Sequence, residues 1–277
     1  MIRLSYEQLV ELTQLNPYKR FSDGRPCVPK ELLEAVKEVS IEHAWKVLKD
    51  HGYRRQYAGS WIETNPGKVI AGRATTAQFL PHRPDFDAYV ALNGEREGRP
   101  PTGYQNSWVI EDLIQDDLMV VDIFGKIADG TVIGDNLGTA IRTRTGVGAI
   151  IDGGMRDYRG LTKFSDVNFF ARGVHPSAIA GVTLAGVNIP VRVGEATVLP
   201  GDVVLATPSG MIAIPPHLVE EVVQTARETD LRDEFGKLRL SESKYGSGEI
   251  DEPVWSGTLE QDFQEWRRGQ DDVTSKL

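Results

Sequence analysis

The chain has 277 residues, and its 31 Lys and Arg against 40 Asp and Glu give a formal net charge of −9. This acidic balance argues against nucleic acid as the main partner, because phosphate binding requires a surplus of basic side chains. Cys27 is the only cysteine, which excludes intramolecular disulfides and cysteine-based zinc sites. With neither a signal peptide nor an apolar stretch of about eighteen residues, we expect a cytoplasmic protein that does not contact membranes.

The first third of the chain predicts helices around one long strand. Residues 1–28 indicate a short helix and a Pro- and Gly-containing loop, which form an N-terminal extension. Apolar residues at helical spacing predict one long helix over 29–50. A strand is expected from Lys68 to Leu80. Residues 81–104 are rich in Pro, Gly and charge, so they predict an inserted exposed loop with one helical turn.

From residue 105 the pattern alternates between helix and strand. The predicted elements are helices over 106–115 and 137–145, strands over 118–125, 131–133 and 147–154, short β segments between 166 and 214, and a helix over 215–238. The polar last residues, 246–277, are predicted to be a C-terminal extension. Within them Leu259, Phe263 and Trp266 form an apolar stripe on a helix beginning at Ser256, which we expect to dock on the body or on a neighbouring subunit.

Residues 120–160 carry the candidate chemistry. Their strand–turn–helix–strand pattern returns the chain to the end where the helix began, so Gly134–Gly138 should lie near Arg156 and Asp157. The backbone N–H groups of 136–138 begin a helix and lack intrahelical partners, so they can bind a carboxylate or an oxyanion.

The charged side chains of this segment suit a metal-bound acid. Arg156 offers a bidentate contact to a carboxylate, and Asp157 is a hard oxygen ligand suited to Mg²⁺. Asp135 could orient Arg156 or a metal-bound water. From spacing alone, the same residues can also be an ordinary helix cap beside a solvated surface ion pair.

The stretch GDNLGTAIRTRTGVGAIIDGGMRD resembles the signature of the RraA-like family, which includes 4-hydroxy-4-methyl-2-oxoglutarate aldolases and the regulator of ribonuclease activity A. The family pattern is an Asp, twenty residues and then Arg-Asp, and Asp135 and Arg156-Asp157 match it. The similarity extends over roughly residues 65–245. It implies an α/β fold, an α/β/β sandwich of the swivelling, phosphohistidine-domain-like type. The catalytic domain would span 29–245, with helical extensions on both sides.

The resemblance also implies an activity. It predicts a divalent-metal-dependent class II lyase, of the 4-hydroxy-2-oxo acid aldolase or oxaloacetate decarboxylase type, that cleaves a C–C bond of a 2-oxo acid through a metal-stabilised pyruvate enolate. The cofactor would be Mg²⁺ or Mn²⁺. The protein would form a homotrimer or homohexamer with sites at subunit interfaces.

Residue roles carry over from the same resemblance. The catalytic residues would be Arg156 and Asp135, and Asp157 would bind the metal. The substrate contacts are predicted at Gly134, Asn136, Leu137 and Arg156. An acidic residue of a neighbouring subunit, Glu234, would complete the metal shell. The chain departs from the family at Gly160, where an acidic residue is frequent, and at residues 206–210, which lack the usual acidic turn.

Two alternatives remain open from the sequence: a non-catalytic regulator that binds a ribonuclease or another protein, and an enzyme acting on a sugar-derived oxo acid. The five histidines show no metal-binding spacing and are expected to be surface or core groups, with His82 and His175 the two to test.

Overall fold

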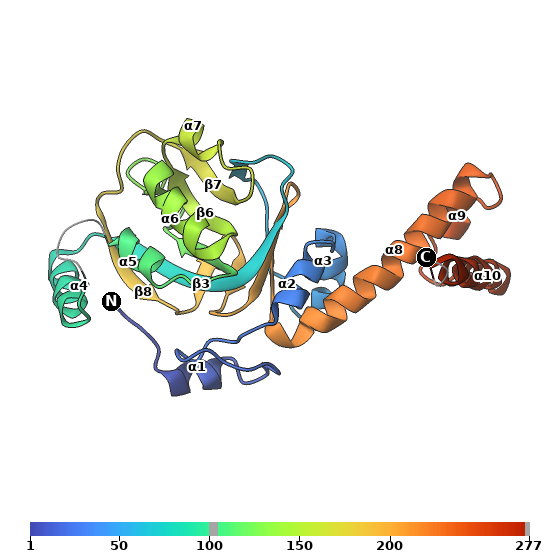
Figure 1. Cartoon of the computed structure of the whole chain (residues 1–277), viewed down its shortest axis with the longest axis horizontal. Helices are drawn as coiled ribbons and strands as arrows, with labels where there is room; N and C mark the ends of the chain where they lie inside the picture. The colour runs from blue at the N-terminus through green and yellow to red at the C-terminus, as the bar shows by residue number, and fades with distance from the viewer. Residues whose placement is uncertain (100–104, 275–277) are drawn as a thin grey trace. The chain divides into compact units, whose positions relative to one another are not determined.

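The computed structural model describes residues 1–99 and 105–274 (Figure 1). The chain divides into two compact units, Met1–Val223 and Gln224–Leu277. Within the described residues, no helix has both the length and the apolar character needed to cross a membrane. The predicted extents 1–28, 29–245 and 246–277 stay predictions.

The first unit is a mixed α/β fold built on a ten-stranded sheet, as the sequence predicted at the level of class. Its strand order is β1-β12-β11-β3-β4-β6-β7-β2, with β5 paired to β6 and β8 paired to β3. The strands β3, β4, β6 and β7 are parallel to one another, and β5 is parallel to β6. The strands β11, β8 and β2 pair with this group in the antiparallel sense. The bounds are β1 (Tyr57–Ala58), β2 (Ile62–Glu63), β3 (Ile70–Pro81), β4 (Asp117–Asp122), β5 (Thr131–Ile133), β6 (Gly148–Met155), β7 (Asn168–Val174), β8 (Val182–Val187), β11 (Val203–Thr207) and β12 (Gly210–Ile214). A separate hairpin is formed by β9 (Val191–Val193) and β10 (Ala196–Val198).

The helices agree with the sequence in part. Those of the first unit are α1 (Tyr6–Leu12), α2 (Lys30–Val36), α3 (Ile41–Asp50), α4 (Pro84–Arg96), α5 (Asn106–Glu111), α6 (Asp135–Thr145), α7 (Tyr158–Leu161) and the short 3₁₀ helix η1 (Pro216–Leu218). The single helix expected over 29–50 is wrong. The chain breaks between α2 and α3, where the Ser40 hydroxyl accepts a hydrogen bond from the His43 amide and caps a new helix.

The segment 81–104 is also different from the prediction. Instead of a loop with one turn it contains the thirteen-residue helix α4. Pro84 stands at the helix start, where its missing N–H costs nothing, and Asp85 and Asp87 favour the first turn electrostatically. Gly94 then lets the helix approach the Trp108 ring closely. Residues 100–104 of the predicted loop lie outside the described residues.

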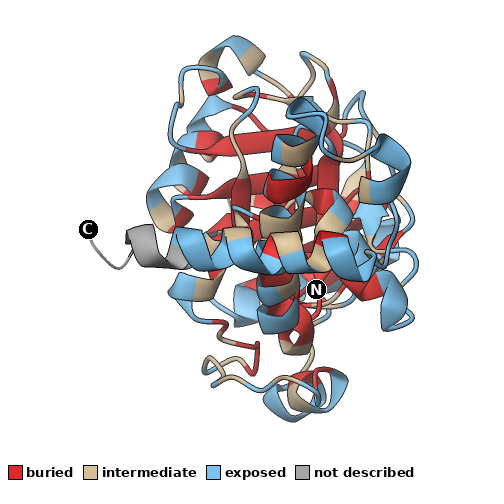
Figure 2. Ribbon diagram, turned by 90° about the vertical axis from the view of Figure 1, so that its right-hand side faces the viewer, coloured by how far each residue is buried: buried red, intermediate tan, exposed pale blue. Residues whose placement is uncertain are grey.

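The sheet has two covered faces because alternate side chains point to opposite sides. Met119 and Val121 of β4 pack in one cluster with residues of α5 and α6, including Trp108 and Ile141. Leu118 and Val120 pack in another cluster, together with residues of β9 and β10. Figure 2 shows the buried residues concentrated in the strands, with exposed residues on the outer helix surfaces. One face is therefore covered by helices and the other by strands.

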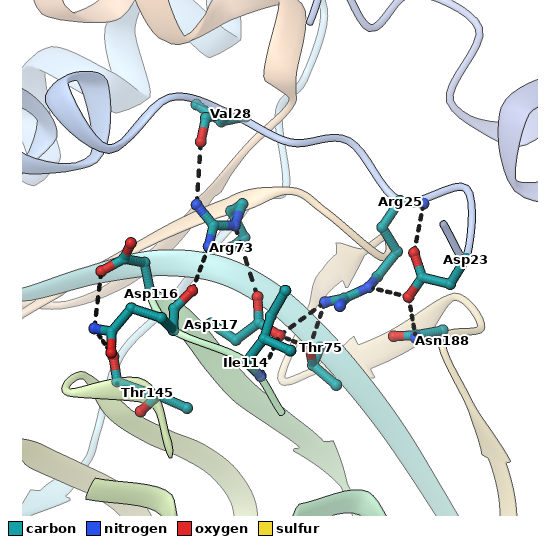
Figure 3. Close-up of polar contacts among 11 residues, drawn as sticks. Asp23, Arg25, Val28, Arg73, Thr75, Ile114, Asp116, Asp117, Thr145 and Asn188 are labelled. Carbon is teal, nitrogen blue, oxygen red and sulfur yellow. Dashed lines mark hydrogen bonds and ion pairs between the residues drawn. The ribbon is translucent and has the colours of Figure 1, made fainter. Parts of the chain in front are cut away.

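A buried ion network fastens the N-terminal segment to the sheet (Figure 3). Arg25, only 3% exposed, donates to Asp117 Oδ2 at 3.1 Å and also to the Thr75 hydroxyl. Arg73 Nε lies 3.6 Å from Asp117 Oδ1, and Arg73 Nη1 donates to the Val28 carbonyl. Asp117 on β4 thus balances two buried guanidinium groups, one of them from residues 1–28.

The second unit is helical and has its own apolar core. It contains the C-terminal part of α8 (Val219–Ser241) together with α9 (Ser247–Ile250) and α10 (Gly257–Thr274). The predicted stripe on the last helix is confirmed: Leu259 and Phe263 are buried against Phe235 of α8, and Trp266 packs beside them. The stripe therefore has its partner within this unit.

Candidate functional site

The candidate site lies where two neighbouring parallel strands end. Strands β5 and β6 pair in parallel, with Ile133 opposite Met155, and α6 connects them. Gly134 follows β5 and Arg156 follows β6, so both emerge at the same edge of the sheet. The Arg156 amide donates to the Ile133 carbonyl at 2.9 Å and fixes the two ends together. The strand–turn–helix–strand prediction is confirmed.

The first turn of α6 presents unused backbone donors. Gly134 caps the helix in an extended conformation, and the amides of Asp135, Asn136 and Leu137 have no acceptor among the described residues. The Gly138 amide, predicted to be free, donates to the Gly134 carbonyl at 2.8 Å, so that part of the prediction is wrong. The helix starts at Asp135, which makes Gly138 the first residue able to close an intrahelical bond.

Arg156 and Asp157 form a strained, half-exposed pair beside these donors. Asp157 has φ 52° and ψ 35°, a left-handed conformation that costs on the order of 1–3 kcal/mol outside glycine. The Arg156 Nε atom lies 3.5 Å from Asp157 Oδ2, and the two side chains are 43% and 44% exposed. This distance is too long for a strong hydrogen bond, so both charged side chains keep hydrogen-bonding capacity for a ligand.

A small cavity of about 60 Å³ joins these groups. The residues predicted from sequence that line it are Gly134, Asp135, Asn136, Leu137, Arg156 and Asp157. The predicted proximity is confirmed, while the chemical roles of these residues stay predictions. Sequence reasoning missed Asn106, Thr131 and Ile179, which also line the cavity. Asn106 begins α5 and Ile179 lies in the loop after β7, both distant in sequence, whereas Thr131 stands only three residues before Gly134 but belongs to no recognisable motif.

Two glycines leave the space that the carboxylates occupy. A Cβ on Gly134 would overlap Asp157 Oδ2 and stand 3.1 Å from Arg156 Nε. A Cβ on Gly160 would stand 2.7 Å from Asp135 Oδ2. Gly160 is the position at which the family often has an acid. In this chain the Asp135 carboxylate occupies the space that a side chain at position 160 would need.

The donor set suits a hard divalent cation. Among the described residues no three His, Cys, Asp or Glu side chains gather into a complete metal site. Mg²⁺ does not need one, because it keeps several waters and commonly takes one or two protein carboxylates. Asp157, which has no hydrogen-bonded cation and a glycine-made space around its Oδ2, fits that requirement.

Two other sets of predicted residues lie elsewhere. Glu234 is exposed on the part of α8 that belongs to the second unit, and its role as a ligand from a neighbouring subunit stays a prediction. His175 Nδ1 lies 2.8 Å from the Ser177 hydroxyl, and His82 Nδ1 lies 4.0 Å from Asp87 Oδ1. Neither histidine lines the small cavity.

Comparisons with known proteins agree with the resemblance seen in the sequence. The family model described as RraA-like, Aldolase/RraA, matches residues 30–213. A Halalkalibacterium halodurans protein, provisionally named 4-hydroxy-4-methyl-2-oxoglutarate aldolase, is 27% identical over 127 residues, which is 46% of this chain and 60% of that protein. Protein DlpA of Legionella pneumophila is 29% identical over 178 residues, which is 63% of this chain and 26% of DlpA. This chain therefore spans less than two thirds of either relative.

A solved structure has a similar fold. Streptomyces coelicolor RraAS2, described as an unusual member of the RNase ES inhibitor RraA protein family, superposes with a TM-score of 0.64 at 25% identity. The match covers 80% of this chain and 100% of RraAS2. The mixed α/β fold of this chain is thus similar to that of RraAS2.

Proposed function

The chain belongs to the RraA-like family, and from this membership we propose that it is a divalent-metal-dependent lyase that cleaves a carbon–carbon bond of a 2-oxo acid. The reaction would be of the 4-hydroxy-2-oxo acid aldolase or oxaloacetate decarboxylase type. The observation that carries the proposal is the convergence of three free amides, Arg156 and Asp157 on one cavity. The amides and Arg156 can bind the negative oxygens of the acid, and Asp157 can bind the cation that chelates it.

Asp157, supported by Asp135, is the residue that would hold Mg²⁺ or Mn²⁺. When bound, such a cation supplies positive charge that polarises a neighbouring keto group. Gly134 contributes by leaving room for the Asp157 carboxylate.

The remaining steps use groups of the chain itself. The Arg156 guanidinium would bind the substrate carboxylate with two parallel hydrogen bonds. The amides at 135–137 would donate to an oxygen that gains negative charge as the C–C bond breaks, and such fixed donors are effective because they need no reorientation. Asp135 Oδ2 would take the proton of the 4-hydroxyl and return it to the carbon left by cleavage.

The test is pyruvate release from a panel of 4-hydroxy-2-oxo acids and from oxaloacetate, with and without chelator. Loss of one such charged contact should lower kcat/KM about 100-fold or more in Arg156→Ala. Asp157→Ala should remove the activity together with its metal dependence. Arg159→Ala, an exposed arginine three residues along the chain, is the matched control and should keep wild-type rates. Full activity in chelator-treated protein would refute the metal-dependent mechanism.

A second candidate is a regulator without catalytic activity. It is favoured by the similarity to RraAS2 and by the net charge of −9, which suits a basic protein partner such as a ribonuclease. A salt-sensitive partner in a pull-down, with no pyruvate released from any acid of the panel, would favour this function over the lyase.

Finer expectations accompany the proposal. We infer that the fold is an α/β/β sandwich of the swivelling-domain type and that the protein is cytoplasmic. We also infer a homotrimer or homohexamer in which Glu234 of a neighbouring subunit completes the metal shell. Light scattering of the purified protein measures the oligomeric state directly.

A further inference from the structure

A second, larger cavity adjoins the candidate site. Its volume is about 480 Å³, against about 60 Å³ for the site cavity. Asn106, Ala178 and Ile179 line both cavities, so the two share a wall. If the 2-oxo acid group of a substrate occupies the smaller cavity, the remaining carbon atoms of the substrate can extend into the larger one.

The wall between the cavities contains an unmatched polar group. Asn106 is only 3% exposed, and its Nδ2 donates to the Val132 carbonyl directly before the site loop. Its Oδ1 is buried and has no hydrogen-bond donor among the described residues. A buried acceptor of this kind is unfavourable unless a ligand or water supplies a donor. A hydroxyl group at the junction of the two cavities would supply one.

The larger cavity combines apolar residues, such as Phe79, Ile179 and Val182, with a group of polar and acidic ones. It is lined by the side chains of His82, Asp87, Gln105, Asp129 and Ser177. Asp87 Oδ1 accepts from the Thr183 hydroxyl at 2.7 Å and from Gln105 Nε2 at 3.0 Å, whereas its Oδ2 has no partner within the described chain. Neither Lys nor Arg is among the described lining residues.

This lining discriminates between classes of substrate. A terminal carboxylate entering the cavity would meet two carboxylates and no fixed cation, and like charges brought together oppose binding. Hydroxyl groups, in contrast, can donate to the free oxygens of Asp87 and Asp129 and accept from a histidine N–H. The cavity therefore favours a neutral, hydroxylated chain.

From these observations we propose that the larger cavity is the subsite for the distal part of the substrate and selects a hydroxylated 2-oxo acid over one that ends in a second carboxylate. This inference rests on the proposed lyase function, because it assigns the 2-oxo acid head to the smaller cavity. Asp129 and Ala180 belong to the larger cavity alone, which makes them suitable for testing it separately from the chemistry.

The experiment compares two six-carbon 4-hydroxy-2-oxo acids, one trihydroxylated and one ending in a carboxylate, with oxaloacetate and pyruvate as short ligands. Calorimetry gives the Kd of each acid, and the pyruvate assay gives kcat/KM. The wild type should prefer the trihydroxylated acid about tenfold or more, the size expected for one unfavourable charge contact at about 4 Å in a surface site. Ala180→Trp, which fills the larger cavity, should raise the Kd of the trihydroxylated acid at least tenfold, because about 1.4 kcal/mol of lost contact corresponds to a tenfold change in Kd. The Kd of pyruvate, which does not reach this cavity, should stay within twofold of the wild-type value.

Two further variants complete the design. Ala91→Trp, at an exposed alanine of α4 outside the lining, is the matched control and should change nothing. Asp129→Asn removes one negative charge while keeping a side chain that tolerates the left-handed backbone at this position (φ 56°). It should improve binding of the dicarboxylic acid severalfold without affecting pyruvate.

The outcomes separate the two proposals. If Ala180→Trp weakens pyruvate and the trihydroxylated acid equally, or if the wild type prefers the dicarboxylic acid, the subsite is refuted even where cleavage occurs. If no acid is cleaved but the binding differences hold, the subsite stands and the lyase function falls. If no 2-oxo acid binds at all, both are refuted.

Discussion

Gly134 leaves open the space into which the Asp157 carboxylate extends. Its φ of −122° is ordinary for any residue, so the glycine is not required by backbone conformation. A methyl group there would overlap Asp157 Oδ2 and press on Arg156 Nε at 3.1 Å. The absence of a side chain at Gly134 therefore bears directly on the orientation of the proposed metal ligand.

Gly134→Ala should fold normally and bind the cation poorly. The displaced Asp157 carboxylate should weaken Mg²⁺ or Mn²⁺ binding by about 10–100-fold, as loss of ligand orientation commonly does. Calorimetric metal titration measures the affinity, and circular dichroism checks the fold. Gly257→Ala is the control, because its new methyl would meet nothing within 4 Å. Equal metal affinity in both variants would contradict a role for the space at Gly134.

At the level of residues, the sequence could identify the parts of the site that are close in the chain. Gly134 to Leu137 and Arg156-Asp157 belong to one strand–helix–strand unit, whose geometry returns the chain to its start. Asn106 and Ile179 could not be found in this way. Asn106 reaches the cavity from helix α5, where its side chain bonds the Val132 carbonyl, and Ile179 reaches it from the loop that follows β7. No spacing in the sequence encodes these contacts.

At the level of elements, β4 carries the buried ion network through Asp117. The fully buried Asp117 balances Arg25 and Arg73, so it links the N-terminal segment to the sheet. Removing one member of a buried pair leaves an uncompensated charge, which costs more than the pair contributes.

Asp117→Asn should therefore lower the free energy of unfolding by about 3–5 kcal/mol. Urea denaturation followed by circular dichroism measures the change. The neighbouring Asp116→Asn is the control, because Asp116 is only partly buried and Asn is favourable at its left-handed φ of 65°. Similar small effects of the two substitutions would show that the network does not stabilise the sheet.

The strands were predictable for a physical reason that the helices did not share. Runs such as 118–125 and 147–154 are apolar except for Asp122 and Asp152, because parallel strands covered on both faces bury their side chains. The break at Ser40 depended instead on a single capping residue, and α4 depended on a proline in its first turn, within segments whose overall composition indicated something else. In α4, Val90 and Gly94 are the buried residues, too few to give a clear helical pattern.

At the level of the whole molecule, the chain has two units with separate cores. The core of the second unit is the aromatic cluster around Phe235, and an ion cluster stabilises it: Arg239 forms a bidentate pair with Asp262, at 2.8 Å for each bond, and Lys244 lies 2.9 Å from the same carboxylate. The hydrogen bonds from Arg239 lower the pKa of Asp262 to about 2, and Lys244 contributes in the same direction.

The lowered pKa predicts an acid-sensitive second unit. An unfolded Asp has a pKa of about 3.9, so the stabilisation from Asp262 is complete above that pH and is lost as the pH falls through about 2. Hydrogen exchange with mass spectrometry should show a loss of protection, relative to the intrinsic exchange rate at each pH, between pH 4 and 2 in peptides from 224–274, to a greater extent than in peptides of the sheet. Asp262→Asn should exchange faster than wild type at pH 7 in the same peptides and lose much of this pH dependence. If the variant and the wild type respond to acid identically, the Arg239–Asp262 pair does not stabilise the unit, and its aromatic cluster alone must hold it together.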